Sequence, residues 1–289
     1  RLFLEGAQSG VRRKEAKVRS LTMVCIALAL LAACDKKPDV KFLKHGEHYS
    51  AKPDFAEVEH QHPIASPELA KITPKYLESL NQEQVDQIYA RLSAGPIPDG
   101  AFDGALFFPK GTSGDKRIAE IIGGWKGFAA NLGAEKLELV GKTLWKGKVF
   151  YRDQRLLRNR IDDLRVLKPL IEGDLSDIPK IDVKGRDAWL LFPARLYCGQ
   201  SLLDSRRESI IIDYAFSDEI QGYRERPDFL ASRRGLKIRD EIRMVRPGFY
   251  LGRAYADRAF LLNFTLQNDG KAGTVNQDCW TGTQVTAAK

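Results

Sequence analysis

Acidic side chains lie at strand positions where alternation predicts apolar ones. Asp240 shares one face of its predicted strand with Ile238 and Ile242, and Asp213 shares one with Ile211. Burying a carboxylate without a partner is costly, so we expect each to meet an arginine, a tyrosine hydroxyl or a backbone donor. The candidate partners are Arg160, Arg195, Arg239, Arg243, Arg253 and Tyr250.

Two interpretations of these carboxylates remain open. They form either ion pairs that fix strand register or the polar end of an otherwise apolar ligand pocket. In the second case, a carboxylate pair could also act as general acid and base, as in glycosidases. The candidate ligand-binding or acid/base residues are Asp213, Asp240, Glu241, Arg239, Arg243, Tyr250 and Trp145.

Histidine occurs only in the N-terminal quarter of the chain. His45, His48, His60 and His62 are weak candidate ligands for zinc, copper or nickel, metals that imidazole suits. Their spacing matches no rigid tetrahedral site. We therefore expect a solvated linker here, and no cofactor.

Residues 1–33 have the features of an export segment. Basic side chains cluster between Arg12 and Arg19, and an uncharged apolar run follows from Leu21 to Ala33. This run is shorter than the about 20 residues that a membrane-spanning helix needs, so it is typical of a signal peptide.

The apolar run ends in Leu31-Ala32-Ala33-Cys34, which resembles the lipobox of bacterial lipoproteins. The resemblance implies cleavage before Cys34, a diacylglyceryl group on its sulfur and usually a further acyl chain, enough for stable anchoring. In enteric members of that family, an aspartate at the position of Asp35 favours retention at the periplasmic side of the inner membrane. The alternative is an ordinary secretory signal with Cys34 as a plain thiol.

The remaining cysteines and the charge agree with an exported protein. Cys25 leaves with the leader and Cys34 takes the lipid, so we expect Cys198 and Cys279 to form a disulfide. A reactive thiol at Cys198 is the alternative, but no histidine follows His62 to serve as its base. Much of the formal net charge of +8 lies in the leader, and the other basic residues alternate with acidic ones, so nucleic-acid binding is not expected.

The rest of the chain divides into a stalk over residues 34–72 and a globular domain over residues 73–289. Four prolines interrupt the stalk, which we expect to be flexible. A helix begins at Thr73 and Pro74, with a break permitted near Asn81, and a second helix is predicted over Asp115 to Asn131.

Strands are predicted wherever aromatic and β-branched residues gather between turn signals. The segments are Ala101–Phe108, Leu137–Leu139, Leu144–Tyr151, Leu156–Ile161, Ala188–Tyr197, Ser209–Phe216, Lys237–Val245, Phe249–Ala256 and Phe260–Gln267. The last three have short connections and predict an antiparallel meander. We expect a mainly β (α+β) fold, an antiparallel β-barrel or strongly curved sheet with one or two helices packed at its N-terminal side.

One short motif resembles a known family of barrels. The run from Gly141 to Gly147, with Trp145-Lys146-Gly147 opening a strand, is similar to the glycine–tryptophan motif of calycin-type barrels such as lipocalins. The resemblance implies a lumen for an apolar or amphipathic molecule, with Trp145 plugging the base of the barrel. Plain core packing is the other role open to Trp145.

Together these features favour a membrane-anchored lipoprotein of the cell envelope that binds a lipid or another hydrophobic small molecule and is not an enzyme. The domain contains no Gly-x-Ser-x-Gly elbow, no phosphate-binding glycine loop and no zinc-ligand spacing. Two alternatives remain: an envelope enzyme that uses Asp213, Asp240 or Glu241 as acid and base, and a scaffold that contacts other envelope proteins.

Overall fold

The structure is a computed structural model that describes residues 37–46, 51–108, 145–165, 171, 173–271 and 279. Contacts divide the chain into two units, Arg1–Pro38 and Asp39–Lys289, and the described helices and strands all lie in the second unit. The predicted signal peptide, Cys34, His48, the predicted helix Asp115–Asn131 and the predicted strand Leu137–Leu139 lie outside the described residues. Among the described residues, no helix has the length and hydropathy that crossing a membrane requires.

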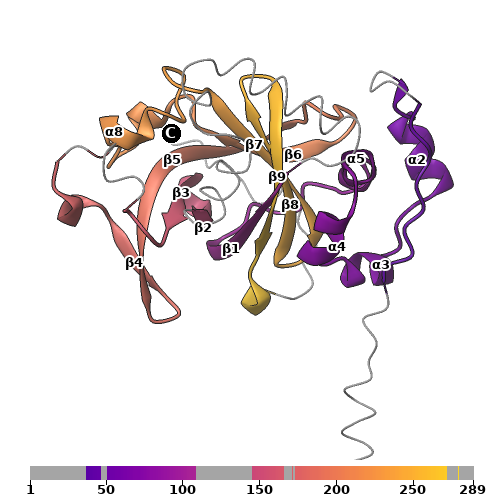
Figure 1. Ribbon diagram of the computed structural model, residues 1–289, viewed down its shortest axis with the longest axis horizontal. Coiled ribbons are helices and arrows are strands. Elements are labelled where there is room, and N and C mark those ends of the chain that lie inside the picture. The colour runs from indigo at the N-terminus through magenta and orange to yellow at the C-terminus, as the bar shows by residue number, and fades with distance from the viewer. Residues whose placement is uncertain are drawn as a thin grey trace, which may run out of the picture. The chain divides into compact units, whose positions relative to one another are not determined.

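An eight-stranded antiparallel β-barrel forms the body of this unit (Figure 1), which confirms the predicted fold class. Consecutive strands are neighbours around the wall, and pairing of the first strand with the last closes it. The barrel strands are β1 (Gly100–Phe107), β2 (Trp145–Tyr151), β3 (Leu156–Ile161), β5 (Arg186–Gln200), β6 (Glu208–Asp213), β7 (Ile238–Arg246), β8 (Phe249–Ala256) and β9 (Ala259–Gln267).

One strand lies outside the closed wall and was not predicted. β4 (Lys180–Val183) pairs only with the first part of β5, while β5 also pairs with β3 and β6. Figure 1 shows this β4–β5 hairpin beside the barrel, and Lys184 at its tip reaches Asp103 on β1. β4 is short and half of its residues are exposed, so it lacks the apolar pattern by which a strand is recognised in a sequence.

Large aromatic rings occupy the barrel interior because glycines on the neighbouring strands make room for them. A side chain at Gly104 would overlap the ring of Trp145, and one at Gly252 would overlap the ring of Phe264. These two rings meet edge to face, with centroids 5.7 Å apart. Trp145, one of the predicted site residues, therefore lies in the barrel interior.

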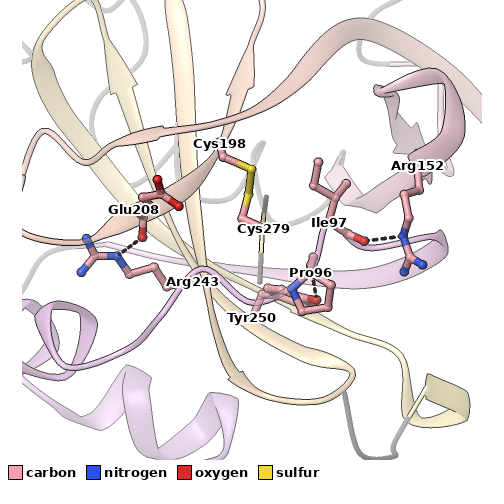
Figure 2. The surroundings of a disulfide bond; sticks show 8 residues. All are labelled: Pro96, Ile97, Arg152, Cys198, Glu208, Arg243, Tyr250 and Cys279. Atoms are coloured by element: carbon pink, nitrogen blue, oxygen red, sulfur yellow. Dashed lines mark hydrogen bonds between the residues drawn. A yellow bond between two sulfur atoms is a disulfide. The ribbon is translucent and has the colours of Figure 1, made fainter. Parts of the chain in front are cut away.

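The segment before β1 packs against one end of the barrel. Ala94 and Ile97 belong to the same buried apolar cluster as the interior side chains. The buried Tyr250 hydroxyl donates to the Pro96 carbonyl at 2.9 Å, and Arg152 Nε donates to the Ile97 carbonyl at 2.6 Å (Figure 2). We call this the closed end.

The predicted disulfide between Cys198 and Cys279 is confirmed. Both residues are buried in the interior cluster, and their Cα atoms lie 5.9 Å apart. Figure 2 shows the bond beside the segment that contains Pro96. It therefore ties the C-terminal part of the chain to β5 near the closed end.

Four short helices pack outside the barrel, at its N-terminal side as predicted. They are α2 (Phe55–Gln61), α3 (Ser66–Lys71), α4 (Pro74–Ser79) and α5 (Gln82–Ala90). The Thr73 hydroxyl caps α4 by accepting from the Tyr76 amide at 3.1 Å. The expected break occurs at Asn81, whose side chain caps α5.

The structure differs from the expected flexible stalk over residues 55–72. Phe55 and Ile72 are buried in the cluster that joins the helices to the outer wall of β7 and β8, and Val58 is also fully buried. The prolines do not prevent helices here, because Pro53 precedes the cap of α2 and Pro67 lies in the first turn of α3. Proline is tolerated at those positions, since the first amides of a helix have no intrahelical acceptor.

Candidate functional site

A polar network lies inside the barrel, enclosed by apolar side chains. The Lys148 ammonium, from β2, forms an ion pair with Asp240 on β7, with Nζ and Oδ2 2.9 Å apart. The ammonium also donates to the Asn159 side-chain oxygen at 2.9 Å and to the Tyr214 hydroxyl at 2.6 Å. Every hydrogen of this buried ammonium therefore has an acceptor.

The network connects opposite sides of the wall. The Tyr214 hydroxyl accepts from Asn159 at 2.9 Å and donates to Asp240 at 3.3 Å. Trp145 adds its indole N–H, which donates to the Asn159 oxygen at 2.8 Å. A barrel interior that holds a charged pair must satisfy it internally, and these contacts do so.

Burial controls the protonation chemistry of the network. Removal from water lowers the pKa of Lys148, and the Asp240 carboxylate opposes that effect. Burial also raises the pKa of Tyr214 well above its usual range. The Lys148 ammonium lies 5.4 Å from the ring centroids of Trp145, Tyr214 and Phe264, so three aromatic faces further stabilise the cation.

The barrel end opposite the closed end, which we call the mouth, is lined by apolar side chains. Leu106, Trp145, Ile238 and Leu262 come from the mouth ends of four strands and are only partly buried. The Lys148–Asp240 pair lies deeper in the same interior. The mouth thus combines apolar side chains with a charged pair beneath them.

Three of the predicted site residues point into the barrel, though not to one place. Asp240 and Trp145 join the Lys148 network, whereas Tyr250 lies at the closed end. The partner of Asp240 is a lysine, which the candidate partners did not include. Lys148 and Asn159 were not among the predicted site residues. Asn159 nevertheless lies between Leu157 and Ile161, and a polar residue among apolar ones on one strand face is the same signal that identified Asp240.

Asp213, Glu241 and Arg239 lie on the outer side of the wall. Asp213 accepts from the Tyr197 hydroxyl at 3.1 Å and from the Ala215 amide at 2.8 Å. Glu241 is fully buried and pairs with Arg239, with Oε1 and Nη2 3.1 Å apart. Asp240 therefore faces away from both other carboxylates, so the structure forms no acid/base pair between Asp240 and either of them.

Arg243 is a structural residue beneath α5. Its guanidinium is fully buried and donates to the carbonyl groups of Tyr89 at 3.0 Å and Glu208 at 3.1 Å (Figure 2). The Asp204 and Arg207 carbonyls also accept from it, at 3.0 and 2.6 Å. Arg243 thus fixes α5, the loop between β5 and β6, and the start of β6 to β7, and it exposes no donor to a ligand.

The histidines are not gathered into a metal site within the described residues. Of the four, His45, His60 and His62 are described, and no group of three or more histidine, cysteine or acidic side chains in that part of the chain could hold a metal ion. His62 contributes its backbone instead, since its carbonyl accepts from Arg91 Nη1 at 2.6 Å.

Models of known protein families do not match this chain, and neither do curated proteins. A crystal structure described as a protein from Thermomonospora curvata has 17% sequence identity and a TM-score of 0.36, and the match covers 71% of this chain and 97% of that one. Similarity at this level carries no conclusion about function. The fold and its interior define the class: an eight-stranded up-and-down antiparallel barrel with a charged pair inside.

Proposed function

We propose that this protein is a lipid-anchored lipoprotein of the bacterial cell envelope, and that its barrel binds a small amphipathic molecule without transforming it. The observation that carries the binding proposal is the mouth, where partly buried apolar side chains lie at the end of an interior that holds a charged pair. Ligand sites are typically apolar surfaces with a few placed polar groups.

Each part of an amphipathic ligand has a counterpart at the mouth. A hydrocarbon segment would contact Leu106, Ile238 and Leu262, while a polar headgroup would lie toward Lys148 and Asp240. Barrels of about eight strands have room for one small ligand. The up-and-down strand order supports the calycin-like character that the Trp145-Lys146-Gly147 motif implies.

The anchor rests on the sequence Leu31-Ala32-Ala33-Cys34. Acylation at Cys34 would hold the barrel at a membrane surface, and Asp35 favours the periplasmic side of the inner membrane. The disulfide supports an oxidising compartment. A lipid taken from the nearby membrane is therefore the hydrophobic molecule that we favour as ligand.

Two leucines of β9 provide a matched test of binding. Leu262 belongs to the mouth and packs against the interior cluster, whereas its neighbour Leu261 does not belong to that cluster, and both are partly buried. The full chain in detergent is titrated with dansyl-undecanoic acid, a fluorescent fatty acid. We expect Leu262→Gln to weaken binding about tenfold and Leu261→Gln to leave it unchanged. Equal effects of both substitutions, or no binding to the wild type, would refute a ligand at the mouth.

The anchor is tested separately in bacterial cells that express the full chain. Wild-type protein should incorporate radioactive palmitate and partition with membranes, and Cys34→Ser should do neither. Cys25→Ser is the control, since it removes a cysteine from the predicted leader without changing the sequence Leu31-Ala32-Ala33-Cys34. Unlabelled wild-type protein together with membrane-bound Cys34→Ser would exclude lipidation while leaving the binding test intact.

A further inference from the structure

Three residues on neighbouring strands form a row across the outer wall. Asp103 on β1 is opposite Gly147 on β2, and Gly147 is opposite Arg160 on β3. Because Gly147 has no side chain, the Arg160 guanidinium crosses its backbone and reaches Asp103, with Nη2 and Oδ1 2.8 Å apart. A Cβ atom at Gly147 would lie 2.0 Å from the Phe102 carbonyl, so the row depends on glycine.

This row is the floor of two adjoining clefts, which the tip of the β4–β5 hairpin borders. Asp103, Arg160, Val183 and Lys184 line both of them. The larger cleft has a volume of about 610 Å³ and the smaller about 290 Å³, sizes that suit small-molecule ligands. From the hairpin, Lys184 Nζ reaches Asp103 at 2.6 Å, yet the lysine side chain is 79% exposed. Lys184 can therefore move aside at little cost.

Arg160 has hydrogen-bonding capacity that the protein does not use. The residue is only 6% exposed, and within the part of the chain that the structure describes neither Nε nor Nη1 has a hydrogen-bond partner. The nearby Asp162 Oδ1 is buried and also lacks one, although it lies 3.5 Å from Arg160 Nε. Unsatisfied donors and an unsatisfied acceptor thus lie side by side, an arrangement that costs stability unless a ligand completes it.

We propose that these clefts bind a neutral polyhydroxylated molecule, a saccharide, on the outer wall of the barrel. A hydroxyl group can accept from the Arg160 guanidinium and donate to the Asp162 carboxylate at the same time. A carboxylate group can only accept, and an ammonium group can only donate. This site is independent of the proposed binding at the mouth.

The charge of the lining also favours a neutral ligand. Its three cationic side chains and four carboxylates leave a formal charge of only −1, so neither a strongly anionic nor a strongly cationic ligand is strongly attracted overall. The charged residues are Arg160, Lys184, Arg186, Asp103, Asp162, Asp182 and Asp269. The side chains of Gln267 and Asn268 contribute further polar groups to the larger cleft.

The test uses the full chain in detergent and three neutral saccharides: trehalose, maltotriose and the N-acetylglucosamine trimer. Binding at millimolar concentration is measured by saturation-transfer NMR, with inorganic phosphate followed by calorimetry as the anionic probe. We expect at least one saccharide to bind, and Arg160→Gln and Arg160→Lys each to weaken it about tenfold. Arg160→Lys keeps the charge beside Asp103 but removes the forked donors, so it separates recognition from a loss of folding.

Arg158→Lys is the matched control. Arg158 lies on the same strand and the same outer face, but its guanidinium donates to the Gln221 carbonyl and lines neither cleft. Saccharide binding should be unchanged in this variant. The proposal is overturned if none of the saccharides binds, if phosphate binds in their place, or if Arg160→Lys binds as well as the wild type.

Discussion

The Lys148 ammonium and the Asp240 carboxylate, 2.9 Å apart, are almost fully buried within the barrel, at 3% and 7% side-chain exposure. Removing one partner leaves the other charge unpaired among apolar side chains, so we expect Lys148→Met to cost about 3 to 5 kcal/mol of unfolding free energy. Urea denaturation measures this loss of unfolding free energy. The double substitution Lys148→Met with Asp240→Leu should recover most of the loss, and an additive double variant would show that the pair is not coupled.

The barrel class was predictable because its strands carry their pattern locally. β3 and β8 have the predicted boundaries, and the last three strands form the expected meander. Alternation also placed Asp240 correctly among Ile238 and Ile242. It could not show that Asp213 points outward, because Ile211, on the outer side, is as deeply buried as the interior residues.

The rest of the interior network depends on an irregularity that alternation does not reveal. A bulge between Trp145 and Gly147 shifts the register of β2. Strict alternation would put Trp145 and Lys148 on opposite faces, but the extra residue brings both inside. The contact between Lys148 and Asp240 therefore could not be predicted from alternation alone.

The disulfide closes a large loop, since its cysteines are 81 residues apart. Restriction of the unfolded chain by such a loop corresponds to roughly 4 to 5 kcal/mol. Cys198→Ser, Cys279→Ser and the double variant should therefore lose similar amounts of stability, measured by urea denaturation. Reducing agent should destabilise the wild type alone, and an equal response in the double variant would contradict this explanation.

Substitution of Gly147 tests whether the backbone beneath Arg160 requires a glycine. Its φ is +140°, and an added Cβ would clash with the Phe102 carbonyl. We expect Gly147→Ala to cost about 2 to 4 kcal/mol by thermal denaturation. Gly185→Ala is the control, because Gly185 also has a positive φ, +77°, but a Cβ there meets nothing within 4 Å. Similar losses in the two variants would mean that conformation, not close approach, explains the glycine.

Asp228 should give the protein a pH dependence. Burial raises its pKa from 3.8 to about 6, although the Arg224 and Phe192 amides donate to the carboxylate. The folded state then binds more protons than the unfolded state between these values, so this contribution to stability is present below pH 3.8 and is lost as the pH rises through 6. The change amounts to about 3 kcal/mol.

Asp228→Asn removes this titration. Urea denaturation at a series of pH values should show a smaller loss of stability in the variant than in the wild type across that range. Parallel curves would show that Asp228 keeps an ordinary pKa. Asp187→Asn is a suitable control, because the Asp187 side chain is 65% exposed and forms a surface ion pair with Lys180, with Oδ2 and Nζ 3.5 Å apart.

The barrel closes where β1 pairs with β9, so this pairing joins a strand that is synthesised early to one that is synthesised late. Asp103 lies opposite Gln267, and Phe107 lies opposite Asn263. Until β9 has been synthesised, one edge of β1 has open amide and carbonyl groups that can pair with other chains. The order of synthesis therefore leaves an unfinished or truncated copy with an exposed strand edge, so we expect such copies to be prone to aggregation.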